Sequence, residues 1–242
     1  MNPAAKKDIR VAIIDNSINP SVYKPVEHWA GFLQVPFSSF RALEGLHPDL
    51  EKDFTHLILT GSEASIMQRE AWVNAEVEFV QEALRLDFPI LGSCYGHQLL
   101  ALALRGPAHV RRALRPEIGW YPIDIRIKSG LLGEEGAVYA FSSHFDEVID
   151  LDEDFRVLAS TPGCPVQAFE LKDRPVWGLQ FHPEIDIPAA LEFLRNLVDL
   201  GLKTSVLFAE ALSMNPQDSG LIRRIVRHFL RATRGRQSGF FP

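Results

Sequence analysis

The chain has 242 residues, a length that suits one large α/β domain or one domain with an appendage. Its composition is that of an ordinary globular protein, and its net charge of −6 argues against binding to nucleic acid. It contains no apolar run near the ~18 residues of a membrane span, and its two cysteines, Cys94 and Cys164, are too few for a disulfide framework. We therefore expect a cytoplasmic protein without membrane contact.

The first part of the chain alternates short apolar runs with a helical pattern. Residues 10–15 and 55–60 are predicted to be buried strands, because each is a short apolar run closed by turn residues. Residues 71–86 carry valine and leucine at helical spacing, with acidic residues between them, which predicts an amphipathic helix. Pro89 ends this helix, and Ile90 begins the next strand. Buried strands joined by helices indicate a parallel sheet covered on both faces.

The strand that begins at Ile90 leads into residues 92–96 (GSCYG) and then into a helix-forming segment at 99–104. This Gly-x-Cys-x-Gly pattern between a strand and a helix is typical of a nucleophile elbow, with cysteine in place of serine. A helix N-terminus carries roughly half a positive charge, which favours a thiolate over a thiol. The pattern predicts that Cys94 is a nucleophile.

Beyond Trp120 the strand-like runs are joined by Gly, Pro and Asp turns, and we expect antiparallel hairpins at the edge of the sheet. These runs are residues 121–127, 137–141, 155–159 and 166–169.

A further strand-like run ends in residues 180–184 (QFHPE). A cysteine nucleophile needs a base, and the base needs an acceptor that orients it. His182 and Glu184 can fill these two roles, since the members of a triad are neighbours in space rather than in sequence.

The elements together predict an open, doubly wound, mostly parallel α/β sheet of the flavodoxin-like kind, with antiparallel hairpins at its edge. Active sites of such sheets lie at the carboxyl ends of the strands, where Gly61, Cys94 and His182 all fall. Helices are expected at residues 189–200, 204–214 and 219–234. We expect residues 1–200 to form one domain and residues 201–242 a helical C-terminal extension packed on it.

These motifs resemble class I (triad-type) glutamine amidotransferase domains, above all the stand-alone members that are similar to the amidotransferase domain of GMP synthase. The resemblance covers residues 9–195 and rests first on residues 92–98 and 180–184, in that order. It extends to residues 57–62, which resemble the family's oxyanion strand and loop, and to residues 117–120 and 143–148.

The resemblance implies an amidohydrolase that releases ammonia from glutamine, or from another γ-glutamyl compound, through a γ-glutamyl thioester on Cys94. His182 would donate the proton to the leaving nitrogen, and Glu184 would fix the imidazole tautomer. The backbone N–H groups of Gly61 and Tyr95 would form the oxyanion hole. The residues implied to bind the amino-acid end of the substrate are Gln98, Ser143, Phe145 and Asp146. For the neighbouring His144, a structural hydrogen bond is an equal alternative. No metal or cofactor is implied.

One position departs from the resemblance. Ser62 and Glu63 stand where many members of the family carry Pro and Gly. We expect the Glu63 carboxylate near the mouth of the site, where it would favour a substrate with a positive group beyond the scissile bond.

Two other functions stay open at this point. A γ-glutamyl peptide hydrolase would use the same triad, whereas a regulatory module would sense glutamine without catalysis. The presence of Cys94, His182 and Glu184 together argues against the sensor. The sequence contains no ATP-binding loop of the Gly-x-x-x-x-Gly-Lys-[Ser/Thr] type, so the ammonia would be passed to a separate synthase subunit or simply released.

The C-terminal segment carries charge of the opposite sign to the rest of the chain. From Ser219 onward there are six arginines and no acidic residue. The arginines are interpreted as a solvated face of a docked helix, or as a contact surface for a second copy of the chain, a synthase subunit, or nucleic acid. Phe240 and Phe241 would dock onto such a partner or onto this fold.

Overall fold

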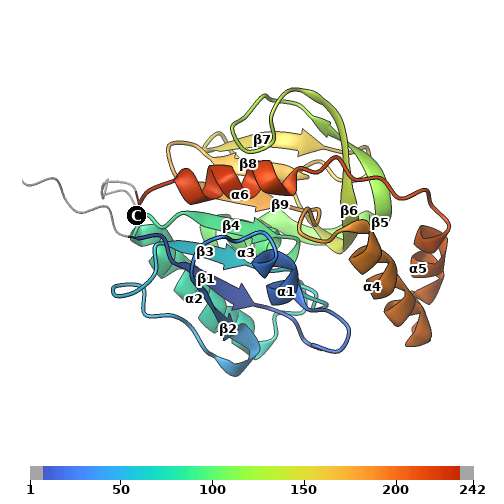
Figure 1. Cartoon of the computed structure of the whole chain (residues 1–242), viewed down its shortest axis with the longest axis horizontal. Coiled ribbons are helices and arrows are strands. Elements are labelled where there is room, and N and C mark those ends of the chain that lie inside the picture. Colours follow the sequence, from blue (N-terminus) through green and yellow to red (C-terminus); the bar gives the residue numbers. More distant parts are fainter. Residues whose placement is uncertain (1–7, 235–242) are drawn as a thin grey trace, which may run out of the picture.

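The computed structural model describes residues 8–234, which contain a nine-stranded sheet in the order β2-β1-β3-β4-β9-β8-β7-β5-β6 (Figure 1). Five neighbouring strands are parallel: β2 (Phe37–Arg41), β1 (Val11–Asp15), β3 (His56–Leu59), β4 (Ile90–Ser93) and β9 (Val176–Leu179). The other four pair antiparallel: β8 (Ala168–Leu171), β7 (Phe155–Ser160), β5 (Val110–Ile125) and β6 (Gly136–Val148). The predicted α/β sheet with antiparallel strands on one side is confirmed.

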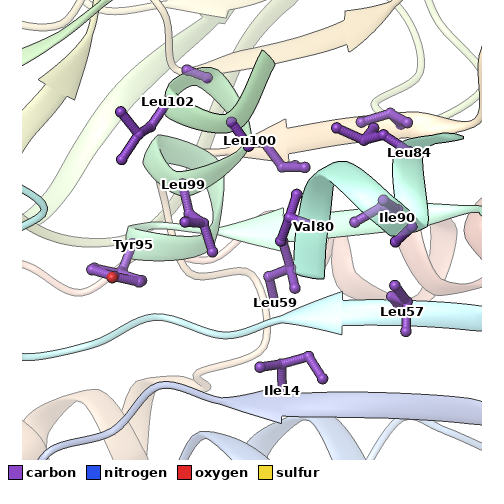
Figure 2. Packing of buried hydrophobic residues seen from close by; sticks show 14 of the residues in the cluster. Ile14, Leu57, Leu59, Val80, Leu84, Ile90, Tyr95, Leu99, Leu100 and Leu102 are labelled. Carbon is purple, nitrogen blue, oxygen red and sulfur yellow. The ribbon is translucent and has the colours of Figure 1, made fainter. Parts of the chain in front are cut away.

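The central parallel strands are buried on both faces, as their continuous apolar runs predict. Every residue of β1, β3 and β4 is buried. On one face, Leu57 and Leu59 of β3 pack with α2 (Ala71–Arg85) and α3 (Tyr95–Arg105). Figure 2 shows Val80 of α2 and Leu99 of α3 meeting these strand residues. Each such side chain contributes about 1.5–3 kcal/mol by leaving water, so this layer fixes the strands that carry the site.

The opposite face of the sheet is covered by two helices from the two ends of the chain. Trp29 of α1 (Pro25–Ala30) and Ile225 and Phe229 of α6 (Ile222–Arg231) share a buried cluster with strand residues such as Ile13. Figure 1 shows α6, in red, running along the sheet on this side. The helical extension predicted after residue 200 therefore contributes directly to the core. The division into residues 1–200 and 201–242 stays a proposal, which the burial of α6 supports.

The arginines of α6 lie on its outer side. Arg223, Arg224 and Arg227 are exposed, while Ile225 and Phe229 are fully buried. Beyond the helix, the Arg234 guanidinium donates hydrogen bonds to the carbonyls of Leu50 and Phe54. The structure thus places the basic residues on a docked helix. The expectation for Phe240 and Phe241 falls outside the described residues.

A pair of helices closes one end of the sheet. α4 (Ile187–Asp199) begins at Asp186, whose carboxylate accepts the backbone N–H of Ala189 at 2.9 Å as an N-cap. It packs with α5 (Ser205–Leu212), and the two helices stand together beside β5 and β6 in Figure 1. Leu194 of α4 and Phe208 of α5 are buried against Trp120 and Phe141 of these strands.

Candidate active site

The sharp strand-to-helix turn predicted around Cys94 is present between β4 and α3. Cys94 has φ 48° and ψ −103°, a strained conformation for a residue other than glycine, and it directly precedes the first residue of α3. Its backbone N–H donates to the Leu179 carbonyl at the end of β9 (2.7 Å), and the Gly96 N–H donates to the Thr60 carbonyl after β3 (3.1 Å). The turn is therefore tied to both neighbouring strands, and it holds the thiol at the carboxyl edge of the sheet.

The two glycines of the elbow are required by close contacts between backbone segments. A Cβ on Gly96 would collide with the Leu59 carbonyl, and a Cβ on Gly92 would collide with the Gly96 carbonyl. Neither contact can be relieved by turning a side chain, because the obstacle in both cases is backbone. The pattern Gly-x-Cys-x-Gly is thus a packing requirement of the turn.

We expect Gly96→Ala to destabilise the protein by about 3 kcal/mol or more, since the added methyl group must push α3 away from β3. Urea unfolding followed by circular dichroism measures the effect. Gly31→Ala is the matched control, because Gly31 has φ −58° and its nearest neighbouring atom would lie 3.6 Å from the new Cβ. The control should change the free energy of unfolding by less than about 1 kcal/mol. Equal losses in the two variants would contradict the proposed collision.

His182 and Glu184 follow β9 and form a buried pair beside the elbow. His182 Nδ1 lies 2.9 Å from Glu184 Oε1, which also accepts a hydrogen bond from Ser93 Oγ at 3.2 Å. The backbone N–H of His182 donates to the Phe141 carbonyl of β6 (2.7 Å), so the backbone that carries the imidazole is anchored to this strand. Both side chains are at most 5% exposed.

Burial and charge act in opposite directions on His182. Burial lowers the pKa of the imidazole, but the Glu184 carboxylate and Cys94 outweigh it through charge and hydrogen bonding and raise the pKa to about 10. The imidazole is therefore protonated at neutral pH, between a carboxylate on one side and the thiol of Cys94 on the other.

Two backbone N–H groups near Cys94 are free to bind a ligand. Within residues 8–234, neither the N–H of Gly61 nor that of Tyr95 donates a hydrogen bond. Gly61 follows β3, next to β4, and Tyr95 is the first residue of α3. Free donors at these two strand ends are what an oxyanion hole needs.

Cys94 and His182 line a half-enclosed cavity of about 200 Å³. All four residues predicted to bind the substrate also line it: Gln98, Ser143, Phe145 and Asp146. Its apolar wall comes from α4, α5 and the segments beside them, with Ile185, Phe193, Leu197, Leu202 and Phe208. Such a volume is below the roughly 300–1,000 Å³ of pockets for drug-sized ligands and suits a single amino acid.

The polar residues of this cavity are held in place by one another. The Gln98 amide donates to the Asp146 carbonyl (2.8 Å) and to Gln180 Oε1 (3.2 Å), so its N–H groups are already used within the protein. The Asp146 carboxylate accepts hydrogen bonds from Ser65 Oγ and from the Arg112 guanidinium. Gln98 is thus placed to fix the backbone of residues 143–146.

His144 makes the structural hydrogen bonds that the sequence left as an alternative. Its Nδ1 lies 3.1 Å from the Asp146 carbonyl, and its Nε2 lies 3.3 Å from the buried Glu117 carboxylate. Glu117 also accepts hydrogen bonds from Thr161 and Gln167. This network supports the backbone of residues 143–146 through His144. His144 and Glu117 thus form a buried His–Glu pair in addition to His182 and Glu184.

Glu63 lines the cavity, but its carboxylate is bonded to the protein. Its two oxygens accept the backbone N–H groups of Ile18 (2.9 Å) and Asn19 (3.0 Å), and burial raises the pKa of the carboxyl group. The expected role in favouring a positively charged substrate does not follow from this geometry. Glu63 instead fastens the loop after β1 to the loop after β3.

Sequence reasoning missed Tyr23, which lies in the loop after β1. Its side chain is 3% exposed and lines the cavity, and its ring meets that of His182 edge-on, with centroids 6.0 Å apart. No motif surrounds it, so no local signal could have identified it. Cys164, in contrast, is fully buried away from the cavity lining, and burial raises the pKa of its thiol.

No helix within residues 8–234 is long and apolar enough to cross a membrane. In the same part of the chain, no group of three or more His, Cys, Asp or Glu side chains is arranged to hold a metal ion.

The family model for class-I glutamine amidotransferases matches residues 24–199. The chain belongs to this family. This amidotransferase is similar to a glutamine-hydrolysing GMP synthase subunit from Sulfurisphaera tokodaii, with 35% identity over 153 residues, 62% of this chain and 79% of that protein. It is also similar to the corresponding subunit from Methanothermobacter thermautotrophicus, with 36% identity over 157 residues, 64% of this chain and 78% of that protein. The predicted enzyme family is confirmed.

Solved structures agree on the fold of this amidotransferase. A glutamine amidotransferase from Thermotoga maritima superposes with a TM-score of 0.70 at 19% identity, covering 93% of this chain and 99% of that one. A putative GMP synthase subunit from Thermoplasma acidophilum has a TM-score of 0.62 at 22% identity, covering 86% and 98%. Tyr23 and the residues after α4 lie outside the part that the family model matches, although Tyr23 and Phe208 line the cavity.

Proposed function

We propose that the chain hydrolyses the side-chain amide of glutamine, with Cys94, His182 and Glu184 as a catalytic triad. One observation carries the proposal: a buried imidazole, bonded to the Glu184 carboxylate, lies beside the thiol of Cys94 at the strand-to-helix turn. An imidazolium next to a cysteine favours the thiolate, which is the attacking form.

The reaction then runs in two steps. The Cys94 thiolate attacks the amide carbon, and the oxyanion that develops accepts hydrogen bonds from the N–H groups of Gly61 and Tyr95. His182 gives its proton to the nitrogen, ammonia leaves, and a γ-glutamyl thioester remains. Water, deprotonated by the now neutral His182, attacks the thioester, and glutamate leaves with the thiolate restored. Glu184 keeps the imidazole oriented throughout.

The cavity supports glutamine as the substrate. Its volume of about 200 Å³ suits one amino acid, and the segment 143–146 with Arg112 provides polar groups beyond Cys94. The γ-glutamyl peptide hydrolase, which the sequence left open, would need room for a second residue.

The names of the relatives suggest a partner for this reaction. Each is named as one subunit of GMP synthase, and we propose that the chain passes ammonia to a separate synthase subunit. This partner and the cytoplasmic location stay predictions. Stimulation of glutamine hydrolysis on adding such a subunit, with the two proteins co-eluting, would support the partner; no stimulation at saturating concentration would contradict it.

The proposed triad is tested with an electrophilic glutamine analogue and mass spectrometry. We expect a single label on Cys94, together with release of ammonia and glutamate from glutamine. Label on Cys164, or a chain that hydrolyses glutamine after Cys94 is blocked, would overturn the assignment.

The raised pKa of His182 predicts where activity is lost with pH. We expect kcat/KM for glutamine to stay level around neutral pH and to fall as the pH rises through about 10, because His182 then has no proton for the leaving nitrogen. The sign is the same for stability. A histidine pKa raised above 6.5 in the folded state contributes fully below about pH 6.5, and the contribution is lost as the pH passes 10. A rate that instead rises with the loss of a proton near pH 6.5 would show that His182 is neutral in the resting enzyme.

A further inference from the structure

Tyr23 has a buried hydroxyl group that the protein leaves without a hydrogen bond. The side chain is 3% exposed, and within residues 8–234 its Oη has no partner. A buried polar group without a partner costs stability, so such a group in a site calls for a ligand that completes it. Burial, reinforced by the neighbouring Glu184 and Cys94, raises the pKa of this phenol well above its ordinary value, so the hydroxyl keeps its proton.

This hydroxyl lies between two parts of the proposed catalytic site. A Cβ built on Gly61 would be 2.7 Å from Tyr23 Oη and 2.8 Å from His182 Cε1. The phenol therefore borders both the strand end that offers the oxyanion donor and the imidazole that protonates the leaving nitrogen. The nitrogen departs on the side of the general acid, which is the side where Tyr23 lies.

Tyr23 is also held so that it cannot easily move aside. Its ring packs edge-on against Phe193 of α4 (5.6 Å between centroids) and stacks on His28 of α1 (6.1 Å). The loop that carries it is fastened through the backbone N–H groups of Ile18 and Asn19 to Glu63. A large ring with a fixed position is a steric limit on whatever is attached to the departing nitrogen.

We propose that Tyr23 determines specificity for the leaving group: its ring closes that side of the cavity to anything larger than ammonia, and its hydroxyl hydrogen-bonds to the departing nitrogen. The inference rests on the proposed function and narrows its substrates to the primary amide of glutamine. As the Cys94 sulfur bonds to the carbon and the carbon–nitrogen bond breaks, the proton of His182 moves to nitrogen. The tyrosine oxygen accepts an N–H of the ammonia and keeps its own proton.

The test compares kcat/KM for glutamine and for γ-glutamyl-L-alanine in the full chain. The wild type should strongly prefer glutamine. Tyr23→Ala should raise the ratio for γ-glutamyl-alanine over glutamine by roughly 10–200-fold, the range for a change of shape in a pocket. Tyr121→Ala is the matched control, because it removes a half-buried tyrosine ring of β5 that does not line the cavity. It should leave the ratio unchanged.

Tyr23→Phe removes the hydroxyl group and keeps the ring, so it tests the contribution of the hydroxyl alone. We expect kcat on glutamine to fall about tenfold, the value of one hydrogen bond, with KM nearly unchanged. The melting temperature should rise by roughly 2–4 °C, since a buried group without a partner is removed. A structural role alone would move the melting temperature in the other direction and leave kcat as it is.

Failure of the inference on Tyr23 and failure of the proposed glutamine hydrolysis would give different results in these assays. If the wild type hydrolyses glutamine but Tyr23→Ala leaves the substrate ratio unchanged, or the wild type cleaves both substrates equally, the inference on Tyr23 is overturned and the proposed function stands. If no variant hydrolyses either substrate and the glutamine analogue does not label Cys94, the proposed function fails and this inference fails with it.

Discussion

Replacing Cys94 by serine should reduce glutamine hydrolysis by about 10⁴-fold or more, the size of loss seen when a triad nucleophile is removed. The serine hydroxyl fits the same turn, but a hydroxyl gives up its proton far less readily than a thiol, and the variant has no thiolate to attack the amide. Since the two side chains have nearly the same shape and position 94 lines the cavity, where the hydroxyl can meet water, the free energy of unfolding should change little. Ammonia release and urea unfolding measure the two quantities.

Cys164→Ser is the matched control for this variant. Cys164 is fully buried, its thiol contacts the Val166 carbonyl at 3.7 Å, and burial raises its pKa, so it stays a thiol. We expect activity within about threefold of the wild type and a stability loss of about 1–3 kcal/mol, because serine buries a hydroxyl at this position. Retained activity in Cys94→Ser, or its loss in Cys164→Ser at full folding, would contradict the assignment of the nucleophile.

The elbow and the His-x-Glu segment could be predicted from the sequence because each is a local pattern at the end of an apolar strand. β4 and β9 are neighbours and parallel, so Cys94 and His182 meet at one edge of the sheet. Close backbone contacts require glycine at positions 92 and 96. The turn around Cys94 can therefore be recognised from its glycines in the sequence.

The strands that the sequence does not predict have weaker sequence patterns. β2 (Phe37–Arg41) was not predicted, because as an edge strand it is only partly buried and its apolar residues do not form a continuous run. β5 begins at Val110, earlier than the predicted residue 121, and its pairing with β6 is interrupted between Arg112 and Glu117. A charged, irregular stretch of this kind resembles a loop until its pairing partner is known.

Tyr23 shows the limit of pattern reasoning for the site itself. Its ring meets that of His182, although the two residues are separated in sequence by more than half the length of the chain. Only the tertiary fold brings these two residues together.

Two buried His–Glu pairs lie near the cavity, and their side chains alone do not distinguish them. His144 is 3.3 Å from Glu117, and His182 is 2.9 Å from Glu184. The pair of His182 and Glu184 differs from the other because Cys94 interacts with the imidazole of His182. Cys94 and Glu184 together raise the pKa of this imidazole. A charge-neutralising change in each pair therefore separates catalysis from structure.

Glu184→Gln should lower kcat on glutamine by roughly 10³–10⁴-fold, the order expected when the orienting carboxylate of a triad becomes an amide. Without the Glu184 charge, burial is no longer outweighed to the same extent, so the pKa of His182 falls and the alkaline loss of activity moves to lower pH. Kinetics from about pH 6 to 10 measure both effects.

Glu117→Gln provides the comparison, since it removes an equally buried carboxylate that accepts hydrogen bonds from His144, Thr161 and Gln167. Both variants should lose about 1–3 kcal/mol of stability, because each leaves buried donors without a charged acceptor. Only Glu184→Gln should clearly shift the alkaline limit, since the main groups that raise the pKa of His182 are Glu184 and Cys94. If the two variants lost activity equally and kept the same pH profile, the carboxylate of Glu184 would be serving the fold and not the chemistry, and Cys94 would have to work with His182 alone.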